Sequence, residues 1–330
     1  METTPLPSRT SILVAAARAL GAREPDPSVR NPDWLAERLL GPEELELIQA
    51  HPLSRALSKD YGEAVKDPYV IGLMLLLIVR TRYIDERLQR AVQNGAIQVA
   101  ILGAGFDTRA YRFQDLLSGA TVIEVDSQPT QALKKHRIEA VAGNIPRNLT
   151  FAPADFRVDD LSDVLRRAGY QPNRKTFFVW EGVSMYVDET SVRKTLSTIA
   201  GISEPGSSLV MDYAAQGALG LTGTIGQAGM AKNLETWREP WLFGVPDGRE
   251  RDFFAENQME AVELMGLLSA DAIRRYLTRA DGSIVGLPPG TSQWSPPDGS
   301  GSMGTAAAAV NASWYSIAEL KVINSSITHD

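Results

Sequence analysis

A turn bracketed by two glycines, Gly103-Ala104-Gly105, is the first place in the chain where the residue types suggest binding chemistry. It follows the apolar run 99–102, which is too short for a helix and predicts a strand buried on both faces. Glycine at the end of such a strand permits unusual backbone conformations and lets a ligand approach bare backbone. The pattern therefore predicts a cofactor-binding turn, and a tight strand-to-helix corner without a ligand is the alternative.

The residues after the turn indicate the kind of cofactor. Thr108 stands where a dinucleotide fingerprint has its third glycine, so the pattern that holds a pyrophosphate is incomplete. A second apolar strand, 121–125, ends in Asp126, whose carboxylate can accept both hydroxyls of a ribose. A nucleoside without a pyrophosphate fits both features, so we predict S-adenosylmethionine (SAM) rather than NAD. Glu124 could compete for the ribose, and Asp126 could instead cap the following helix.

Two further strand ends carry acids. Asp155 and Phe156 follow a predicted strand at 149–152, and Glu181 follows one at 176–180. The carboxylate of Asp155 can accept the adenine amino proton while Phe156 lies against the ring, and core packing of Phe156 is the alternative. Because parallel strands end at the same edge of a sheet, we expect Gly103, Asp126, Asp155 and Glu181 to surround one crevice. A structural ion pair is the alternative for Glu181.

Two arginines, Arg80 and Arg82, are candidates to bind the SAM carboxylate, which suits a charged bidentate donor. Residues two apart on a helix point to nearly opposite sides, so at most one of them can reach a given ligand. Arg82 has acidic residues at i+3 and i+4 as ordinary surface partners, whereas Arg80 has none. We therefore predict Arg80, and exchange of this role with Arg82 stays open.

Composition excludes several classes of function. The net charge of −7 disfavours nonspecific binding of nucleic acid. The chain has no Cys, and its three histidines are far apart without ligand spacing, so we expect no disulfide and no metal site. The apolar run 70–79 has about half the length of a bilayer span, and the N-terminus lacks the pattern of a signal peptide. These features predict a cytoplasmic protein that does not bind a membrane.

The elements that must position these residues are helices first and a sheet second. Helical spacing and caps predict an N-terminal helical cap or arm over 1–95, whose first thirty residues cover the cofactor pocket or are disordered. From 96 to 330, alternating strands and helices predict a doubly wound α/β sheet in one structural unit, with a lid insertion at about 214–255. The expected elements are strands at 99–102, 121–125, 149–152, 176–180, 207–212 and 314–322, helices at 108–116, 128–141, 159–168, 189–202 and 258–279, and a surface excursion at 288–305.

The sequence resembles a known family in five blocks. LGAGFDTRAYR, EVD, ADFR, WEGVSMYV and RTRYIDE are similar in order and spacing to the leucine carboxyl methyltransferase superfamily, and more closely to its bacterial branch of SAM-dependent O-methyltransferases. The likeness runs from about residue 28 to 280, with a weaker echo at 314–322. The resemblance implies a class I, Rossmann-like fold with a mostly parallel seven-stranded sheet whose final strand is antiparallel. It also implies that Asp126 binds the ribose, that Glu181 faces the methionine end of SAM and that Arg80 binds its carboxylate. Phe156 departs from the family, which usually has leucine there.

The predicted function is transfer of a methyl group from SAM to a carboxylate or hydroxyl of a small molecule. A carboxylate is already ionised at neutral pH, whereas a phenol needs a base, and the absence of a well-placed His/Asp pair favours carboxyl methylation. A nicotinamide-dependent oxidoreductase and a non-catalytic SAM-binding protein are the alternatives, and we expect a monomer or homodimer. The candidates for the catalytic or acceptor side are aromatic residues that could equally be core: Tyr83, Tyr186, Tyr213, Trp241 and Tyr276.

Overall fold

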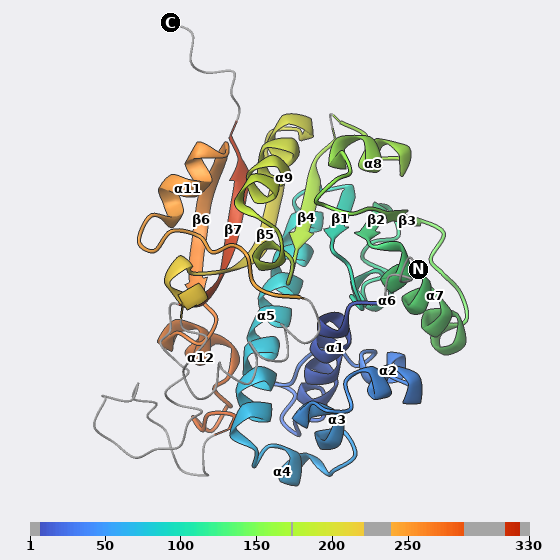
Figure 1. Ribbon diagram of the computed structural model, residues 1–330, viewed down its shortest axis with the longest axis vertical. Helices are drawn as coiled ribbons and strands as arrows, with labels where there is room; N and C mark the ends of the chain where they lie inside the picture. The colour runs from blue at the N-terminus through green and yellow to red at the C-terminus, as the bar shows by residue number, and fades with distance from the viewer. Residues whose placement is uncertain (1–6, 173, 221–238, 287–313, 324–330) are drawn as a thin grey trace, which may run out of the picture.

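The parallel strands predicted around the glycine turn form the centre of one sheet (Figure 1). The computed structural model describes residues 7–172, 174–220, 239–286 and 314–323. Within these residues the sheet has seven strands in the order β3-β2-β1-β4-β5-β7-β6. Their bounds are β1 Gln98–Leu102, β2 Thr121–Asp126, β3 Leu149–Pro153, β4 Thr176–Trp180, β5 Ser208–Ala214, β6 Met259–Gly266 and β7 Tyr315–Val322. β1 to β5 pair in parallel, and β7 lies antiparallel between β5 and β6, which confirms the predicted fold class.

The two faces of the sheet bury separate apolar cores. Along β1, Val99 and Ile101 belong to one core, while Ala100 and Leu102 belong to the other. Every residue of β1 is buried, as expected for a central strand covered on both faces. The first core also contains side chains of helices α1 (Arg9–Gly21), α5 (Pro68–Gln93) and α12 (Ala270–Tyr276). The second contains side chains of helices α8 (Leu161–Arg167), α9 (Glu189–Ile202) and α11 (Glu250–Glu256). The sheet is therefore doubly wound.

Helices α1, α2 (Pro42–Leu47), α3 (Pro52–Ala56) and α4 (Tyr61–Ala64) lie at the end of the sheet toward which β1 and β4 point, while α5 extends from there along one face of the sheet (Figure 1). Asp67 accepts hydrogen bonds from the backbone N–H groups of Tyr69 and Val70, and Pro68 occupies the first turn of the long helix α5. In the part of the chain that the structure describes, no helix is long and apolar enough to cross a membrane. A 3-10 turn at Glu37–Leu39 precedes α2 in the chain.

One predicted helix, at 258–279, is wrong. Its first part is strand β6, which pairs with β7 from Met259 opposite Val322 to Gly266 opposite Ser316, and only Ala270–Tyr276 is helical, as α12. The predicted lid at about 214–255 is described only in part, because 221–238 lie outside the described residues. The predicted excursion at 288–305 lies outside them entirely. The remaining helices are α6 Arg109–Arg112 and α7 Gln128–Ala142, with 3-10 turns at Ser184–Tyr186 and Gln216–Gly220.

Candidate functional site

A cavity of about 530 Å³ lies at the carboxyl ends of the parallel strands. Its wall brings together side chains and backbone from the glycine turn, from the ends of β2, β3 and β4, and from helices α1 and α5. This is the edge of a doubly wound sheet at which ligands bind. All the predicted cofactor-binding residues line it: Arg80, Gly103, Ala104, Gly105, Asp126, Asp155, Phe156 and Glu181.

The glycine turn has the backbone conformation that its sequence suggested. Gly103 and Gly105 have φ angles of +68° and +48°, in the left-handed region that L side chains rarely adopt. A Cβ atom on Gly103 would lie 2.1 Å from Cγ2 of Val183, and one on Gly105 would lie 3.0 Å from Cβ of Ser11. Glycine is thus required both by the backbone conformation and by the close approach of neighbouring side chains.

Asp126 is tied to this turn from the end of β2. Its carboxylate accepts hydrogen bonds from the backbone N–H of Gly105, at 2.5 Å, and from that of Ser127, at 2.6 Å. Burial raises its pKa despite these bonds. Glu124, the competing candidate, is buried beneath the sheet edge, where the ammonium group of Lys134 lies 2.5 Å from its carboxylate, and it does not line the cavity.

Asp155 and Phe156 form a more open part of the wall. Arg157 donates to both carboxylate oxygens of Asp155, at 2.9 and 2.6 Å. These hydrogen bonds lower the pKa of Asp155, which keeps the carboxylate ionised. Phe156 is half-buried, packs against the second core, which was the alternative, and also lines the cavity.

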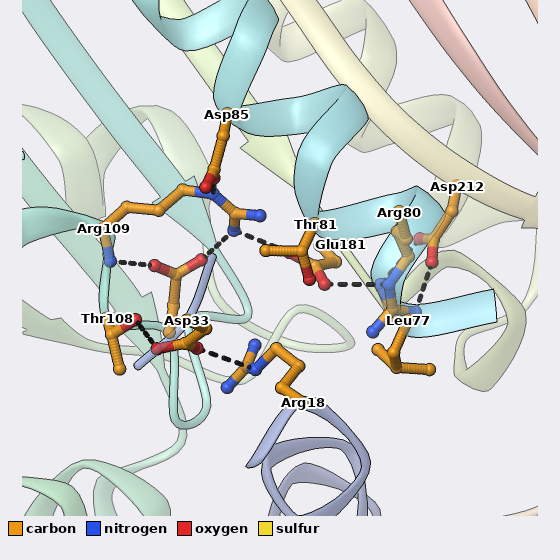
Figure 2. Close-up of polar contacts among 12 residues, drawn as sticks. Arg18, Asp33, Leu77, Arg80, Thr81, Asp85, Thr108, Arg109, Glu181 and Asp212 are labelled. Atoms are coloured by element: carbon orange, nitrogen blue, oxygen red, sulfur yellow. Dashed lines mark hydrogen bonds and ion pairs between the residues drawn. The ribbon is translucent and has the colours of Figure 1, made fainter. Parts of the chain in front are cut away.

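Glu181 and Arg80 place opposite charges side by side in the wall (Figure 2). Nε of Arg80 lies 2.8 Å from Oε1 of Glu181, and Nη1 of Arg80 lies 2.7 Å from Asp212 at the centre of β5. Burial alone would raise the pKa of Glu181, but the guanidinium groups of Arg80 and Arg109 outweigh it and hold the pKa well below its usual range. Arg82, the open alternative, instead donates to the backbone carbonyl of Arg30 and does not line the cavity.

A buried ionic network behind the wall was missed by the sequence analysis (Figure 2). Arg109 joins Glu181 to Asp85 on α5 and to Asp107 in the turn, and Arg112 also pairs with Asp85. Arginine is rarely buried unless it is paired, and composition does not indicate which arginines have buried partners. The alternation of acids and arginines in RYID and FDTRAYR was the signal that could have revealed it.

Helix α1 packs against the glycine turn, where Ser11 lies next to Gly105. The carboxylate of Glu239 accepts hydrogen bonds from the backbone N–H groups of Arg9 and Thr10, at 3.2 and 3.1 Å, and from the hydroxyl of Thr10. Deeper in the cavity, Arg18 donates to the carbonyl of Phe106 at 2.6 Å. The described part of the N-terminal arm therefore forms one side of the cavity.

The aromatic candidates for the acceptor side are divided by the structure. Tyr186 lines the cavity, and burial raises its pKa to about 12. Tyr83 donates to Glu263 on β6, Tyr276 donates to Glu86, and Tyr213 packs in the second core, all away from the cavity wall. Trp241 also stays outside the wall and stacks on Tyr315, with 5.9 Å between ring centroids.

The chain is similar to known proteins over most of the residues that form this cavity. The model of the leucine carboxyl methyltransferase family matches residues 11–200. A Bacillus subtilis protein, YktD, is 34% identical over 217 residues, which cover 63% of this chain and 71% of that protein, and its name assigns it to the S-adenosyl-L-methionine-dependent methyltransferases. A Mycolicibacterium smegmatis protein with the same assignment is 32% identical over 208 residues, covering 62% of this chain and 66% of that protein.

A solved structure shares the fold. The crystal structure of a Thermobifida fusca protein, titled as a methyltransferase, covers 93% of this chain and 98% of its own, with a TM-score of 0.53 and 17% sequence identity. At that identity the likeness concerns the fold alone, and it agrees with the sheet described above. The family match spans the glycine turn and the strand ends that line the cavity, and with the similarity to YktD it shows that the chain belongs to the leucine carboxyl methyltransferase family of SAM-dependent methyltransferases.

Proposed function

We propose that this protein transfers the methyl group of SAM to an oxygen of a small molecule, with a carboxylate as the favoured acceptor and a hydroxyl as the second candidate. The observation that carries the proposal is the pairing of Arg80 with Glu181 in the same cavity as Asp126. The methionine end of SAM carries a carboxylate and an ammonium group, so its site needs a cation and an anion side by side. The ribose hydroxyls of SAM need a carboxylate that accepts their hydrogen bonds. The cavity has both.

The wall residues would hold the donor along its length. Asp126 would accept the ribose hydroxyls, and its bond from the Gly105 N–H fixes the carboxylate against the turn. Asp155 would accept the adenine amino proton, and Phe156 would contact the ring. Glu181 would accept the ammonium group and Arg80 would donate to the carboxylate.

The described wall contains no histidine, and two of its ionisable groups outside the predicted ribose and adenine sites are poor bases for a phenol acceptor. Tyr186 has a pKa of about 12, Glu181 is held ionised by two guanidinium groups, and Glu239 accepts the N–H groups that begin α1. General base catalysis works best when the pKa of the base lies near the working pH, and neither Tyr186 nor Glu181 meets that condition. A carboxylate acceptor needs orientation and exclusion of water rather than deprotonation.

When bound, SAM would supply an electrophilic methyl group for in-line displacement by the acceptor oxygen. The residues of this chain would then have two tasks, to hold donor and acceptor in line and to keep water out. Leu242 and Pro240 give an apolar edge to the cavity, and α1 closes the side above the glycine turn. We further expect a monomer or homodimer in the cytoplasm, and light scattering of the purified chain would measure the oligomeric state.

Two measurements test the proposal. Calorimetric titration with S-adenosylhomocysteine (SAH) should show micromolar or tighter binding that Asp126→Ala abolishes, since a buried carboxylate that accepts two hydroxyls is lost. Incubation of carboxylic acids and matched alcohols with deuteromethyl SAM should give a labelled ester, detected by mass spectrometry. Absence of SAH binding by folded protein would reject the proposal, and a labelled ether without any ester would reject the carboxylate acceptor. Binding of NADH in place of SAH would favour an oxidoreductase.

A further inference from the structure

Arg109 is a fully buried arginine that contacts the candidate site without lining it. Its side chain is 1% exposed, and it is absent from the wall of the cavity. Nη1 lies 2.7 Å from Oε2 of Glu181, and Nε lies 2.7 Å from Oδ1 of Asp85. Arg109 also forms an ion pair with Asp107, two residues earlier in the glycine turn. One guanidinium thus joins α5, the turn and the end of β4 (Figure 2).

This connection differs from the one that Arg80 provides. Arg80 contacts the other oxygen of Glu181, Oε1, and at the same time pairs with Asp212. Asp107 of the glycine turn pairs with Arg109 instead. Arg109 starts α6, directly after the turn, so its position is fixed by the same backbone that receives the ligand. The two guanidinium groups hold one oxygen each, which fixes the plane of the carboxylate.

We propose that Arg109 is a positioning residue that holds the Glu181 carboxylate in place to receive the ammonium group of the methyl donor. This inference rests on the proposed function, because it assumes that Glu181 faces the methionine end of SAM. A carboxylate held at both oxygens before the ligand arrives does not have to be ordered during binding. Loss of one guanidinium would leave it free to rotate and easier to protonate.

Charged groups on several neighbouring elements influence the ionisation of Glu181. Arg80 on α5, Arg109 at the start of α6 and Arg18 on α1 favour its ionised form, and Asp107 in the turn disfavours it. Asp212 on β5 acts through Arg80. With Arg109 removed, Asp107 loses its nearest cation as well, so its negative charge adds to the rise in the pKa of Glu181.

The test is the affinity for SAH measured by calorimetry between pH 5 and 8, with Arg109→Met compared to Arg112→Met. Arg112 is a matched control because it is buried in the same network and pairs with Asp85 at 2.7 Å, yet it has no contact with Glu181. At pH 8, Arg109→Met should weaken SAH binding roughly tenfold, the equivalent of one pKa unit of lost interaction. As the pH falls, Glu181 of this variant takes up a proton, and its affinity should fall by up to about tenfold more per pH unit.

In the wild type and in Arg112→Met, Glu181 stays ionised over this range. Any remaining pH dependence, such as that of Asp126, is common to all three proteins and cancels in the comparison. Equal pH dependence of Arg109→Met and Arg112→Met would overturn the proposal. Loss of the steeper dependence in Arg109→Lys, which restores the charge, would support it.

A second pair of variants keeps the proposal testable if Arg109→Met is poorly folded. Glu181→Gln removes the titrating group, so Arg109→Lys in that background should change SAH affinity less than about twofold. In the wild-type background the same Arg109→Lys change should cost severalfold, because a lysine cannot hold Glu181 and Asp85 with the fork geometry of arginine. Equal costs in both backgrounds would show that Arg109 does not act through Glu181. Because SAH binding is the readout, failure to find an acceptor would leave this test intact.

Discussion

Nη1 of Arg80 lies 2.7 Å from Oδ2 of Asp212, and the two side chains are 3% and 0% exposed. Asp212 also accepts hydrogen bonds from the backbone N–H of Gly182, at 2.6 Å, and from the hydroxyl of Tyr315, at 2.5 Å. A single buried carboxylate therefore connects α5, the loop after β4 and strand β7. Arg80, which lines the cavity, is therefore oriented by this contact.

Removing that carboxylate should destabilise the protein strongly. Asp212→Ala should lower the free energy of unfolding by about 3–5 kcal/mol, because it leaves Arg80 buried with one fewer compensating charge. Tyr315→Phe, which removes one donor from the same carboxylate, should cost only about 1–2 kcal/mol. Urea unfolding of the three proteins measures the difference. A cost below about 1 kcal/mol for Asp212→Ala would show that Glu181 alone compensates Arg80.

The raised pKa of Asp126 predicts a pH dependence of stability without ligand. A carboxyl group whose pKa is higher in the folded state stabilises the fold below its unfolded pKa, and this contribution is lost as the pH rises through the folded value. The stability of the wild type relative to Asp126→Asn should therefore decrease as the pH rises from about 4 toward neutrality. Thermal unfolding at several pH values, with Asp155→Asn as control, measures this trend. A wild type that gains stability relative to Asp126→Asn over this range would contradict it.

The parts of the site that were predictable are those that follow from sheet topology. A glycine turn and acids at the ends of successive parallel strands must come together at one edge, so Gly103, Asp126 and Glu181 could be placed from a strand pattern alone. Arg80 was chosen for its lack of helical partners, and it lies in the wall. Yet Arg82 does not pair with its own helical neighbours, since Asp85 binds Arg109 and Arg112 instead.

Residues governed by contacts distant in sequence were not predictable. β6 is a strand because it pairs with β7, more than fifty residues away, as in the pair Met259 and Val322, and local spacing suggested a helix instead. Tyr83, one of the aromatic candidates for the acceptor side, lies one helical turn from Arg80 on α5. Its side chain points away from the cavity, and its hydroxyl donates a hydrogen bond to Glu263 on β6. Helical spacing gives neighbours along a helix but not the direction in which the cavity opens.

The contact of Glu239 with the start of α1 should protect the first amides of that helix. Glu239→Gln removes a negative charge from a helix N-terminus, where anions are favoured, and weakens its bonds to Arg9 and Thr10. Amide hydrogen exchange of these two residues should become about fivefold faster, which corresponds to about 1 kcal/mol of lost capping. Glu256→Gln, an exposed change at the ion pair with Arg193, is the control and should leave them unchanged. Unchanged exchange in Glu239→Gln would show that α1 is held by other contacts.

Tyr186 distinguishes the two classes of acceptor. Its pKa of about 12 makes it a poor base, so Tyr186→Phe should change kcat by less than about threefold if the acceptor is a carboxylate. Steady-state rates with the acceptor identified by deuteromethyl labelling provide the measurement. Tyr213→Phe, in the second core, is the matched control. A loss of about a hundredfold or more for Tyr186→Phe alone would indicate general acid–base catalysis and hence a hydroxyl acceptor.

Gly103 should be intolerant of a side chain for two separable reasons. Its φ of +68° costs alanine about 1–2 kcal/mol, and a Cβ atom 2.1 Å from Cγ2 of Val183 adds about 1–3 kcal/mol of overpacking. Gly103→Ala should therefore lower the free energy of unfolding by about 2–5 kcal/mol. Gly119→Ala, at a site with no atom within 4 Å of the new Cβ, should change it by less than about 0.5 kcal/mol.

Val183→Ala separates the two costs, because it removes the obstructing methyl groups and leaves the backbone conformation as it is. In a Val183→Ala background, Gly103→Ala should cost at least about 1 kcal/mol less than in the wild type, and the remainder is the price of the left-handed backbone. Urea unfolding of the four proteins of this double-mutant cycle measures the coupling. An identical cost in both backgrounds would show that Val183 moves aside freely, and that backbone conformation alone demands glycine at the end of β1.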